Sequence, residues 1–186
     1  MSLRRDSVGM QPTSERARKR FGEIVLPHLD DAYGLARWLT GQRADAEDVV
    51  QDSCVRALAA LEHASVEQPR AWLLAIVRNA AFTWLARNRP SALLVTDDTQ
   101  LFETAARNGE ASPNAEEALI AADDEAALHR AIAALPPLFK EALVMREISG
   151  LSYREIALAA GAPIGTVMSR LARARAILIE KLGRPQ

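Results

Sequence analysis

Arginine and hydroxyl side chains recur along one side of a predicted helix near the C-terminus. This side holds Thr166, Ser169, Arg170 and Arg173, and the opposite side holds Val167, Leu171, Ala174 and Leu178. The apolar residues are spaced i, i+4, i+7 and i+11, which predicts one buried helical face. A guanidinium group can bond guanine bidentately or hold a phosphate, so the polar side predicts a contact with nucleic acid. A solvated amphipathic helix is the alternative that this pattern leaves open.

Carboxylates form a different polar stripe in the first half of the chain. Asp45, Asp48 and Asp52 are spaced i, i+3 and i+7, and Gln51 lies beside them. A DNA surface is excluded here, because phosphates would repel three acids. The stripe is either an ordinary solvated surface or a docking face for a basic protein, and spacing alone leaves both open. A metal site is not predicted, because no histidine or further carboxylate cluster completes a ligand set.

A third polar stripe consists of Asn79, Thr83 and Arg87, spaced i, i+4 and i+8. Trp72 and Trp84 belong to the same predicted helix. Their rings could stack on unpaired bases, but at helical spacing we expect them to pack in the core.

Catalytic chemistry and cofactors are not predicted. The sequence shows no nucleophile–base pair, no glycine-rich phosphate loop and no metal-ligand spacing, and its three histidines lie far apart. The single cysteine, Cys54, excludes an internal disulfide. It lies on an apolar helical face, where we expect a packed core residue rather than a redox sensor.

The elements that position these side chains are predicted to be α-helices. Of the 186 residues, 49% are hydrophobic and only 5% are aromatic, so aliphatic and alanine side chains must build the core. Good helix formers dominate, and no strand-length run alternates apolar with polar residues, which predicts an all-α protein. The polar N-terminus lacks the apolar core of a signal peptide, and no run reaches membrane-spanning length. We therefore expect a cytoplasmic protein without membrane insertion.

Charge divides the chain into segments. Residues 91–127 hold one arginine and nine acidic residues, whereas residues 128–186 hold nine basic and four acidic residues. Prolines and acids also dilute the apolar pattern after residue 90. We predict two small helical domains, 14–90 and 123–186, joined by a flexible acidic linker over 91–122 with a short helix near 100–106.

Apolar periodicity predicts the helices of both domains. The first domain is expected to hold a helical region over 14–40 that Pro27 interrupts, and helices over 44–61 and 69–89. The buried face of the 44–61 helix is expected at Val50, Cys54, Leu58 and Leu61. The second domain is expected to hold helices over 123–134, 137–148, 153–160 and 164–182.

Helix-boundary residues predict a helix-turn-helix in the second domain. Ser152 and Glu155 form a capping-box pattern, Gly161 suits a left-handed helix end, and Pro163 suits a first helical turn. Two helices joined by a short glycine-containing turn, the second of them basic, are typical of this DNA-binding motif.

Five motifs in order resemble those of a known family. They are DAEDVVQD at 45–52, PRAWLLAIVRN at 69–79, LPP at 135–137, GLSYREIA at 150–157 and GTVMSRLARAR at 165–175. The chain resembles the extracytoplasmic-function group of sigma factors in the sigma-70 family over about residues 20–90 and 123–183. The resemblance implies that the first domain is sigma region 2 and that the second is sigma region 4 with its helix-turn-helix.

The resemblance also implies a role for each polar stripe. Asp45, Asp48, Gln51 and Asp52 would dock on the clamp helices of RNA polymerase core. The polar loop over 63–68 and the helix after it would bind the −10 promoter element and capture a flipped base. The side chains placed near this element are Ser65, Gln68, Arg70, Asn79, Thr83 and Arg87.

The last helix would bind the −35 promoter element. The side chains assigned to it are Thr166, Met168, Ser169, Arg170, Arg173 and Arg175. Arg175 is expected to hold a phosphate or to pair with an acid. Met168 departs from the family, which often has lysine or arginine there, and could instead touch a thymine methyl group.

The function expected from this resemblance is to direct RNA polymerase core to specific promoters, in response to stress and under the control of an anti-sigma factor. Two other functions stay open. A helix-turn-helix regulator would bind operators as a dimer without polymerase. A helical adaptor without a DNA role would not need Arg170 or Arg173.

Overall fold

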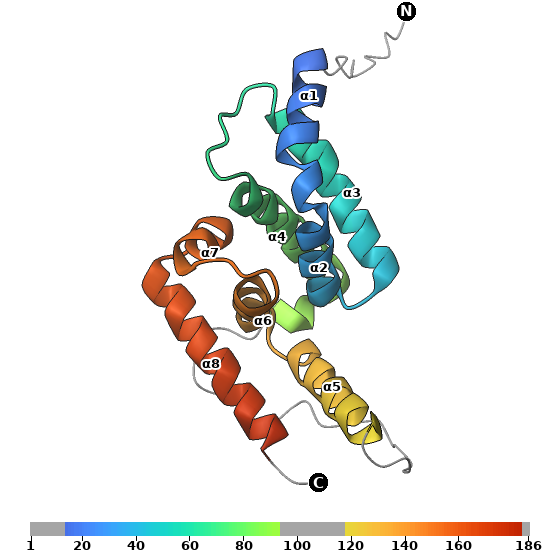
Figure 1. Cartoon of the computed structure of the whole chain (residues 1–186), viewed down its shortest axis with the longest axis vertical. Helices are drawn as coiled ribbons and strands as arrows, with labels where there is room; N and C mark the ends of the chain where they lie inside the picture. Colours follow the sequence, from blue (N-terminus) through green and yellow to red (C-terminus); the bar gives the residue numbers. More distant parts are fainter. Residues whose placement is uncertain (1–13, 94–117, 184–186) are drawn as a thin grey trace, which may run out of the picture.

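The computed structural model describes residues 14–93 and 118–183, with side chains from residue 126 onward in the second range. Every regular element within these two ranges is helical (Figure 1), which confirms the all-α prediction. We refer to the two ranges as the N-terminal unit and the C-terminal unit. The short helix predicted near 100–106 lies outside the described residues.

The N-terminal unit is built from four α-helices and two short 3₁₀ turns. In chain order these are α1 (Glu15–Ile24), η1 (Leu26–His28), α2 (Leu29–Thr40), α3 (Arg43–Ala60), α4 (Pro69–Asn88) and η2 (Pro90–Leu93). Pro27 lies in η1 and separates α1 from α2, as the sequence predicts, since proline cannot donate the backbone hydrogen bond of a continuing helix. Pro69 is the first residue of α4.

The buried face of α3 differs in part from the predicted one, although Leu61 at its end is buried as predicted. The fully buried side chains are small, namely Ala46, Val49, Ser53 and Ala57, whereas Val50, Cys54 and Leu58 are only partly buried. Small side chains on this line let α3 lie close to α2 and α4, and the Ser53 hydroxyl is satisfied by donating to the Val49 carbonyl at 2.7 Å. Val50, Cys54 and Leu58 therefore flank the contact line. Burial also raises the pKa of the Cys54 thiol, in keeping with a packed residue.

Helix α4 is buried on more than one side. Leu73 and Val77 are buried as predicted, but Leu74 and Ala81 are fully buried as well. The reason is that α4 packs against α7 of the C-terminal unit in addition to α2 and α3. A periodicity argument restricted to one domain could not include this second contact.

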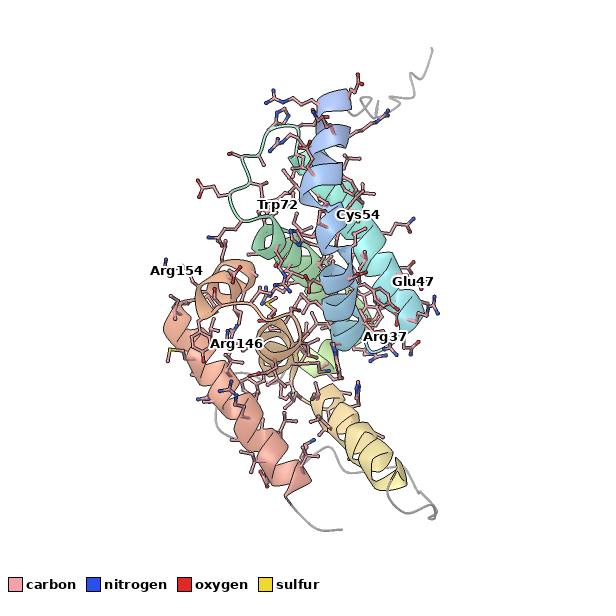
Figure 2. All side chains as sticks on the ribbon, viewed as in Figure 1. Arg37, Glu47, Cys54, Trp72, Arg146 and Arg154 are labelled. Carbon is pink, nitrogen blue, oxygen red and sulfur yellow. The ribbon has the colours of Figure 1, made fainter. Side chains whose placement is uncertain are left out.

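The C-terminal unit contains four α-helices and one π-helical turn. These are α5 (Ala118–Ala133), α6 (Pro137–Leu143), the π-helical turn η3 (Val144–Ile148), α7 (Tyr153–Ala160) and α8 (Ile164–Leu182). Helix α5 begins five residues before the predicted start at residue 123, and the predicted 137–148 helix is divided into α6 and η3. Arg146 (labelled in Figure 2) supports the exit from η3. It donates to the Leu151 carbonyl at 2.8 Å and lies over the Tyr153 ring, 5.0 Å from the ring centroid.

The two units share one apolar core. A single cluster of buried side chains contains Leu73 and Val77 of α4 together with Met145 of η3 and Ile156 of α7. Figure 1 shows α7 beside α4 and α6 beside α2, with α8 on the far side of α6 and α7 from the N-terminal unit. Within the described ranges, no helix has both the length and the apolar content that crossing a bilayer requires.

Candidate nucleic-acid interface

The α7–α8 pair forms a helix-turn-helix in which both ends of α7 are capped. The Ser152 hydroxyl accepts from the Glu155 backbone N–H at 3.3 Å, and the Glu155 carboxylate accepts from the Ser152 N–H at 2.8 Å, which completes the predicted capping box. Gly161 ends α7 with φ at 60°, a left-handed conformation that disfavours other residues. Pro163 is the residue just before α8 rather than its first helical residue.

The predicted division of α8 into a buried and a polar side is largely correct. Val167, Leu171 and Ala174 are buried, and Leu178 is partly buried. The polar side is therefore turned away from the core of its own unit. This orientation is the one that a recognition helix needs if its side chains are to reach base edges in a major groove.

Most of the α8 side chains assigned to DNA are accessible. Met168, Ser169 and Arg173 are exposed and Thr166 is half-buried, with the Ser169 hydroxyl donating to the Thr166 carbonyl at 2.9 Å. Arg175 is exposed and pairs with Glu147 at 2.6 Å. An exposed ion pair of this kind is weak, so Arg175 can exchange its carboxylate partner for a phosphate.

Arg170 has a different environment from the other residues of this side. Its side chain is 12% exposed and lies 3.2 Å from the carboxylate of Glu141, which is 1% exposed. Arg78 of α4 approaches the same carboxylate at 2.7 Å from the N-terminal unit. We call Arg78, Glu141 and Arg170 the triad. With the two units packed together as the structure has them, the Arg170 side chain is thus directed at the Glu141 carboxylate and not at solvent.

The triad places a charge in an apolar junction. Burial raises the pKa of the Glu141 carboxyl, and the guanidinium groups of Arg78 and Arg170 offset only part of this rise. The Arg170 Nε atom is buried and has no hydrogen-bond partner among the described residues. The triad is therefore held together by two ion pairs but is not fully satisfied.

The polar stripe of α4 is accessible. Asn79, Thr83 and Arg87 are exposed, and the Thr83 hydroxyl donates to the Asn79 carbonyl at 2.8 Å. Ser65 and Gln68 are exposed in the segment that precedes α4. These five exposed residues lie on one helix and on the loop that leads into it.

Arg70 lies apart from that surface, although the sequence groups it with the same residues. It donates two hydrogen bonds to Asp31 of α2, at 2.7 and 2.8 Å, and a further one to the Ser149 carbonyl of the C-terminal unit. The Asp31 carboxylate raises the pKa of the Arg70 guanidinium. In this arrangement Arg70 is a contact between the units.

Trp72 and Trp84 are partly buried against the shared core, in agreement with the expected core role. Arg89 lies over the Trp84 ring at 5.5 Å, which covers one ring face with a cation.

The carboxylate stripe lies on α3. Asp48, Gln51 and Asp52 are exposed and Asp45 is half-buried. Asp52 pairs with Arg56 one turn along the helix, at 2.8 Å. Figure 2 shows Glu47 of α3 at one edge of the molecule and Arg154 of α7 at the opposite edge. Helix α3 and the helix-turn-helix therefore lie on opposite sides of the molecule (Figure 1).

Sequence reasoning did not single out Glu141. One local signal was available, because this acid and Lys140 interrupt the otherwise apolar stretch LFKEALVM at 138–145. A charged residue at a position that packing should bury is a recognised pointer to a functional or structural pair. Its partners in α4 and α8 have no local signal of that kind.

Comparison with known proteins identifies the chain. The sigma-70 region 2 family matches residues 24–90, and the sigma-70, region 4 family matches residues 125–178. The extracytoplasmic-function (ECF) RNA polymerase sigma-E factor of Salmonella typhimurium is 34% identical over 182 residues, covering 95% of this chain and 94% of that protein. The chain belongs to the ECF sigma factors of the sigma-70 family.

Other relatives agree with this assignment. The sigma factor is 35% identical over 167 residues to the RNA polymerase sigma-H factor of Pseudomonas aeruginosa, covering 87% of this chain and 86% of that protein. It is 32% identical over 170 residues to ECF sigma factor SigE of Mycolicibacterium smegmatis, and that match spans only 64% of the longer SigE chain.

Two solved structures resemble the sigma factor in fold. The sigma factor RpoE in complex with the anti-sigma factor NepR from Bartonella quintana has a TM-score of 0.63 and 27% identity, covering 90% of this chain and 99% of that one. CnrH in complex with the cytosolic domain of CnrY has a TM-score of 0.62 and 28% identity, with 89% of each chain covered.

Proposed function

We propose that this sigma factor directs RNA polymerase core to specific promoters and contributes no catalytic chemistry of its own. The observation that carries the proposal is the order of two surfaces on one chain. An exposed carboxylate stripe on α3 precedes a capped helix-turn-helix whose polar side is turned away from its own core. A protein partner is expected at the first surface and DNA at the second.

The stripe on α3 is proposed to dock on the clamp helices of the polymerase. Asp48, Gln51 and Asp52 are exposed together on consecutive turns, so a basic helical surface could contact all three. Asp52 and Arg56 lie one helical turn apart, and their ion pair is exposed. Replacing Arg56 by a cation of the polymerase at this carboxylate therefore costs little free energy.

Promoter DNA is proposed to contact α4 and α8. The −10 element would meet Ser65, Gln68, Asn79, Thr83 and Arg87 on the exposed α4 surface. The −35 element would meet the polar side of α8, where Ser169 and Arg173 are accessible and Met168 presents an apolar contact for a thymine methyl group. Arg70 and Arg170 would join these surfaces only after the two units separate.

An anti-sigma factor is proposed as the regulating partner. The solved structures that resemble this fold include sigma factors bound to the anti-sigma proteins NepR and CnrY. A partner that holds the two units together would keep Arg70 and Arg170 in their protein contacts. Because the polymerase is the site of action, the sigma factor is proposed to work in the cytoplasm.

Run-off transcription tests the proposal. Purified polymerase core is incubated with genomic DNA fragments, with and without the full-length chain, and transcript ends are mapped. We expect discrete transcripts that appear only when the chain is present. If competent core yields no promoter-specific transcript with the folded, partner-free chain, the proposed function is wrong.

A further inference from the structure

Helix α1 contacts the loop that leads into α4. This loop, residues 61–68, follows the end of α3 and carries Ser65 and Gln68 of the candidate −10 surface. Helix α1 itself holds none of the residues assigned to polymerase or to DNA. Figure 1 shows the end of α3 beside α1, and the two helices are in contact. Helix α1 is therefore placed to act on the start of the loop.

Arg20 of α1 makes the principal contact with the loop. Its Nη1 atom donates to the Leu61 carbonyl at 2.6 Å, and its Nη2 atom donates to the Ala64 carbonyl at 2.7 Å. Leu61 is the residue at the C-terminal end of α3, where backbone carbonyls lack partners within the helix. A cation is also favourable at this end of a helix dipole. One half-buried guanidinium thus joins the end of α3 to the first part of the loop.

Ser14 and Glu62 make a second contact between α1 and the loop. The Glu62 carboxylate accepts from the Ser14 backbone N–H and from the Ser14 hydroxyl, each at 2.8 Å. These two hydrogen bonds hold the pKa of the Glu62 carboxyl below its ordinary value. Both residues are exposed, so water competes for these groups, and we expect this contact to contribute less than Arg20 does.

Ser65 lies between two anchored residues. Ala64 is held by Arg20, and Val66 packs against the apolar core. The Ser65 side chain between them is exposed. Because both neighbours are fixed, the backbone at Ser65 has few conformations available, and its hydroxyl is presented to solvent from a defined position.

A fixed loop suits the capture of an extruded base. Taking a base out of the stack costs free energy, which the pocket that receives the base must offset. A loop that becomes ordered only on binding adds an entropic cost at the same step. A loop that α1 already holds in place avoids this second cost.

We propose that Arg20 is a positioning residue for promoter recognition: it fixes the loop over residues 61–68 so that Ser65 and Gln68 meet the −10 element. This inference rests on the proposed function of this loop in binding that element. Arg20 acts through the Leu61 and Ala64 carbonyls and needs no contact with DNA of its own. A cation that merely attracts phosphates would strengthen binding to every sequence equally. Positioning of the loop instead predicts that loss of Arg20 reduces discrimination among −10 sequences.

Two variants and one matched control isolate the two hydrogen bonds. Arg20→Met removes both donors and keeps an unbranched apolar side chain. Arg20→Lys keeps the charge but replaces the planar fork by a compact ammonium group, which is less suited to bridging two carbonyls. Arg16→Met is the control, because it removes one cation from an exposed position of the same helix.

The first measurement follows the loop in the full chain without polymerase. Hydrogen exchange is compared between peptides that cover residues 61–68 and peptides from α8. The N–H groups of His63 and Ala64 both donate to the Ala60 carbonyl, so their exchange reports opening of this segment. We expect Arg20→Met to speed exchange in the loop about ten-fold or more, which corresponds to the loss of one charge-assisted hydrogen bond, and to leave α8 unchanged. Exchange equal to that of Arg16→Met would overturn the proposal.

The second measurement uses holoenzyme assembled with each variant. The probe is a fluorescent single-stranded oligonucleotide with the non-template −10 sequence of a promoter mapped by run-off transcription. Derivatives of this oligonucleotide replace each base of the element in turn. We expect Arg20→Met to weaken binding of the matched sequence about ten-fold and to reduce its advantage over the derivatives, because a smaller fraction of the loop is competent to bind. Arg20→Lys should lie between Arg20→Met and the wild type, and Arg16→Met should keep the wild-type discrimination.

Two results of the second measurement would also overturn the proposal. Wild-type discrimination in Arg20→Met would reduce Arg20 to a scaffold residue, whether or not its affinity for polymerase core falls. An equal loss for all sequences, shared by Arg16→Met, would assign Arg20 to general attraction of DNA. Circular dichroism checks that each variant is folded, and Arg20→Lys decides the test if Arg20→Met does not fold. Failure of wild-type holoenzyme to transcribe would refute the proposed function instead, and hydrogen exchange would still decide whether Arg20 holds the loop.

Discussion

At the scale of single residues, the charged groups at the junction of the two units differ sharply from those on the surface. Arg175 and Glu147 form a pair with both side chains 50% exposed, whereas Glu141 is 1% exposed between two arginines. Lys140, next to Glu141, is buried and donates to the Ala133 carbonyl at 2.6 Å. Burial governs the behaviour of these groups, since an exposed pair is screened and a buried charge is not.

Lys140 should make stability depend on pH. Burial, together with the nearby Arg89 cation, lowers the pKa of Lys140 to about 8. In the unfolded chain this lysine keeps its proton up to about pH 10.4, so between these values the unfolded state binds more protons than the folded state. The free energy of unfolding should therefore rise from pH 8 upward, by at most about 3 kcal/mol from this group.

Urea denaturation at several pH values between 7 and 10 measures this slope. Lys140→Met fills the same space without a charge, so it should be more stable than the wild type at pH 7 and should lose the part of the slope that Lys140 contributes. An identical pH dependence in the variant and the wild type would contradict the assignment.

Arg170 and Arg173 should contribute unequally to −35 binding, because Arg173 is exposed and Arg170 is largely buried. Arg173→Ala should weaken binding of the −35 element by about 1–3 kcal/mol if its side chain contacts a base. Arg170→Ala should cause a smaller loss, because its side chain is 12% exposed and lies 3.2 Å from the Glu141 carboxylate. Competition binding to promoter variants measures both effects, with Arg18→Ala on α1 as the charge control.

A loss that is the same for every DNA sequence would reassign these arginines to phosphate contacts. If neither variant changes DNA binding in the holoenzyme, α8 is not the −35 recognition helix.

At the scale of elements, the ends of α7 and the face of α3 have the clearest physical basis. The capping box satisfies backbone donors that would otherwise lack partners at the start of α7. The stripe on α3 places like charges on consecutive turns, which does not stabilise an isolated helix. One feature therefore supports the fold, and the other is available for a partner.

Removing the cap of α7 should destabilise the chain. Ser152→Ala deletes the side-chain acceptor of the Glu155 N–H and should lower the free energy of unfolding by about 1 kcal/mol. Ser152→Asp keeps an acceptor at the same position and should change stability much less. Chemical denaturation of the three proteins checks the prediction, and equal losses in both variants would show that the hydroxyl does not act as a cap.

Reversing charge on α3 should separate polymerase binding from DNA binding. Asp48→Lys with Asp52→Lys should reduce the affinity for polymerase core, because two cations would face a basic partner surface. The control is Glu15→Lys with Glu23→Lys on α1, which changes the net charge equally at other exposed positions. Affinity for core is measured by fluorescence anisotropy of labelled chain, and an unchanged affinity in the α3 double variant refutes the docking assignment.

At the scale of the whole molecule, the two units form one body through their common core. Met145, Leu151 and Ile156 of the C-terminal unit are fully buried in the same cluster as Leu73 and Val77 of α4. Trp38 of α2 also stacks on His129 of α5, with ring centroids 5.0 Å apart. Because the two units share these contacts, the chain should unfold as a single cooperative unit.

Two probes can test this cooperativity. The three tryptophans, Trp38, Trp72 and Trp84, all lie in the N-terminal unit, so their fluorescence follows that unit and, through Trp38, its contact with α5. Far-ultraviolet circular dichroism reports on the helices of both units. The two urea transitions should coincide in the wild type, and separate midpoints would show that the units unfold independently.

The helices, their ends and the polar stripes could be predicted from the sequence because each depends on residues a few positions apart. The spacing of Val167, Leu171 and Ala174 suffices to place the buried side of α8, and Ser152 with Glu155 suffices to start α7. The family resemblance rested on the same short motifs. The face of α3 was less predictable, since small side chains that allow close packing have weak apolar signals.

The environments of Arg70, Glu141 and Arg170 were decided by tertiary structure alone. Arg78 and Glu141 are 63 positions apart, and Arg70 and Ser149 are 79 positions apart. Whether an arginine meets water, DNA or a carboxylate depends on which helix covers it, and that is settled by packing between distant segments. The sequence by itself therefore determined which charged side chains lie on polar helix faces. The fold determined which of them pair with another residue of the protein instead of facing solvent.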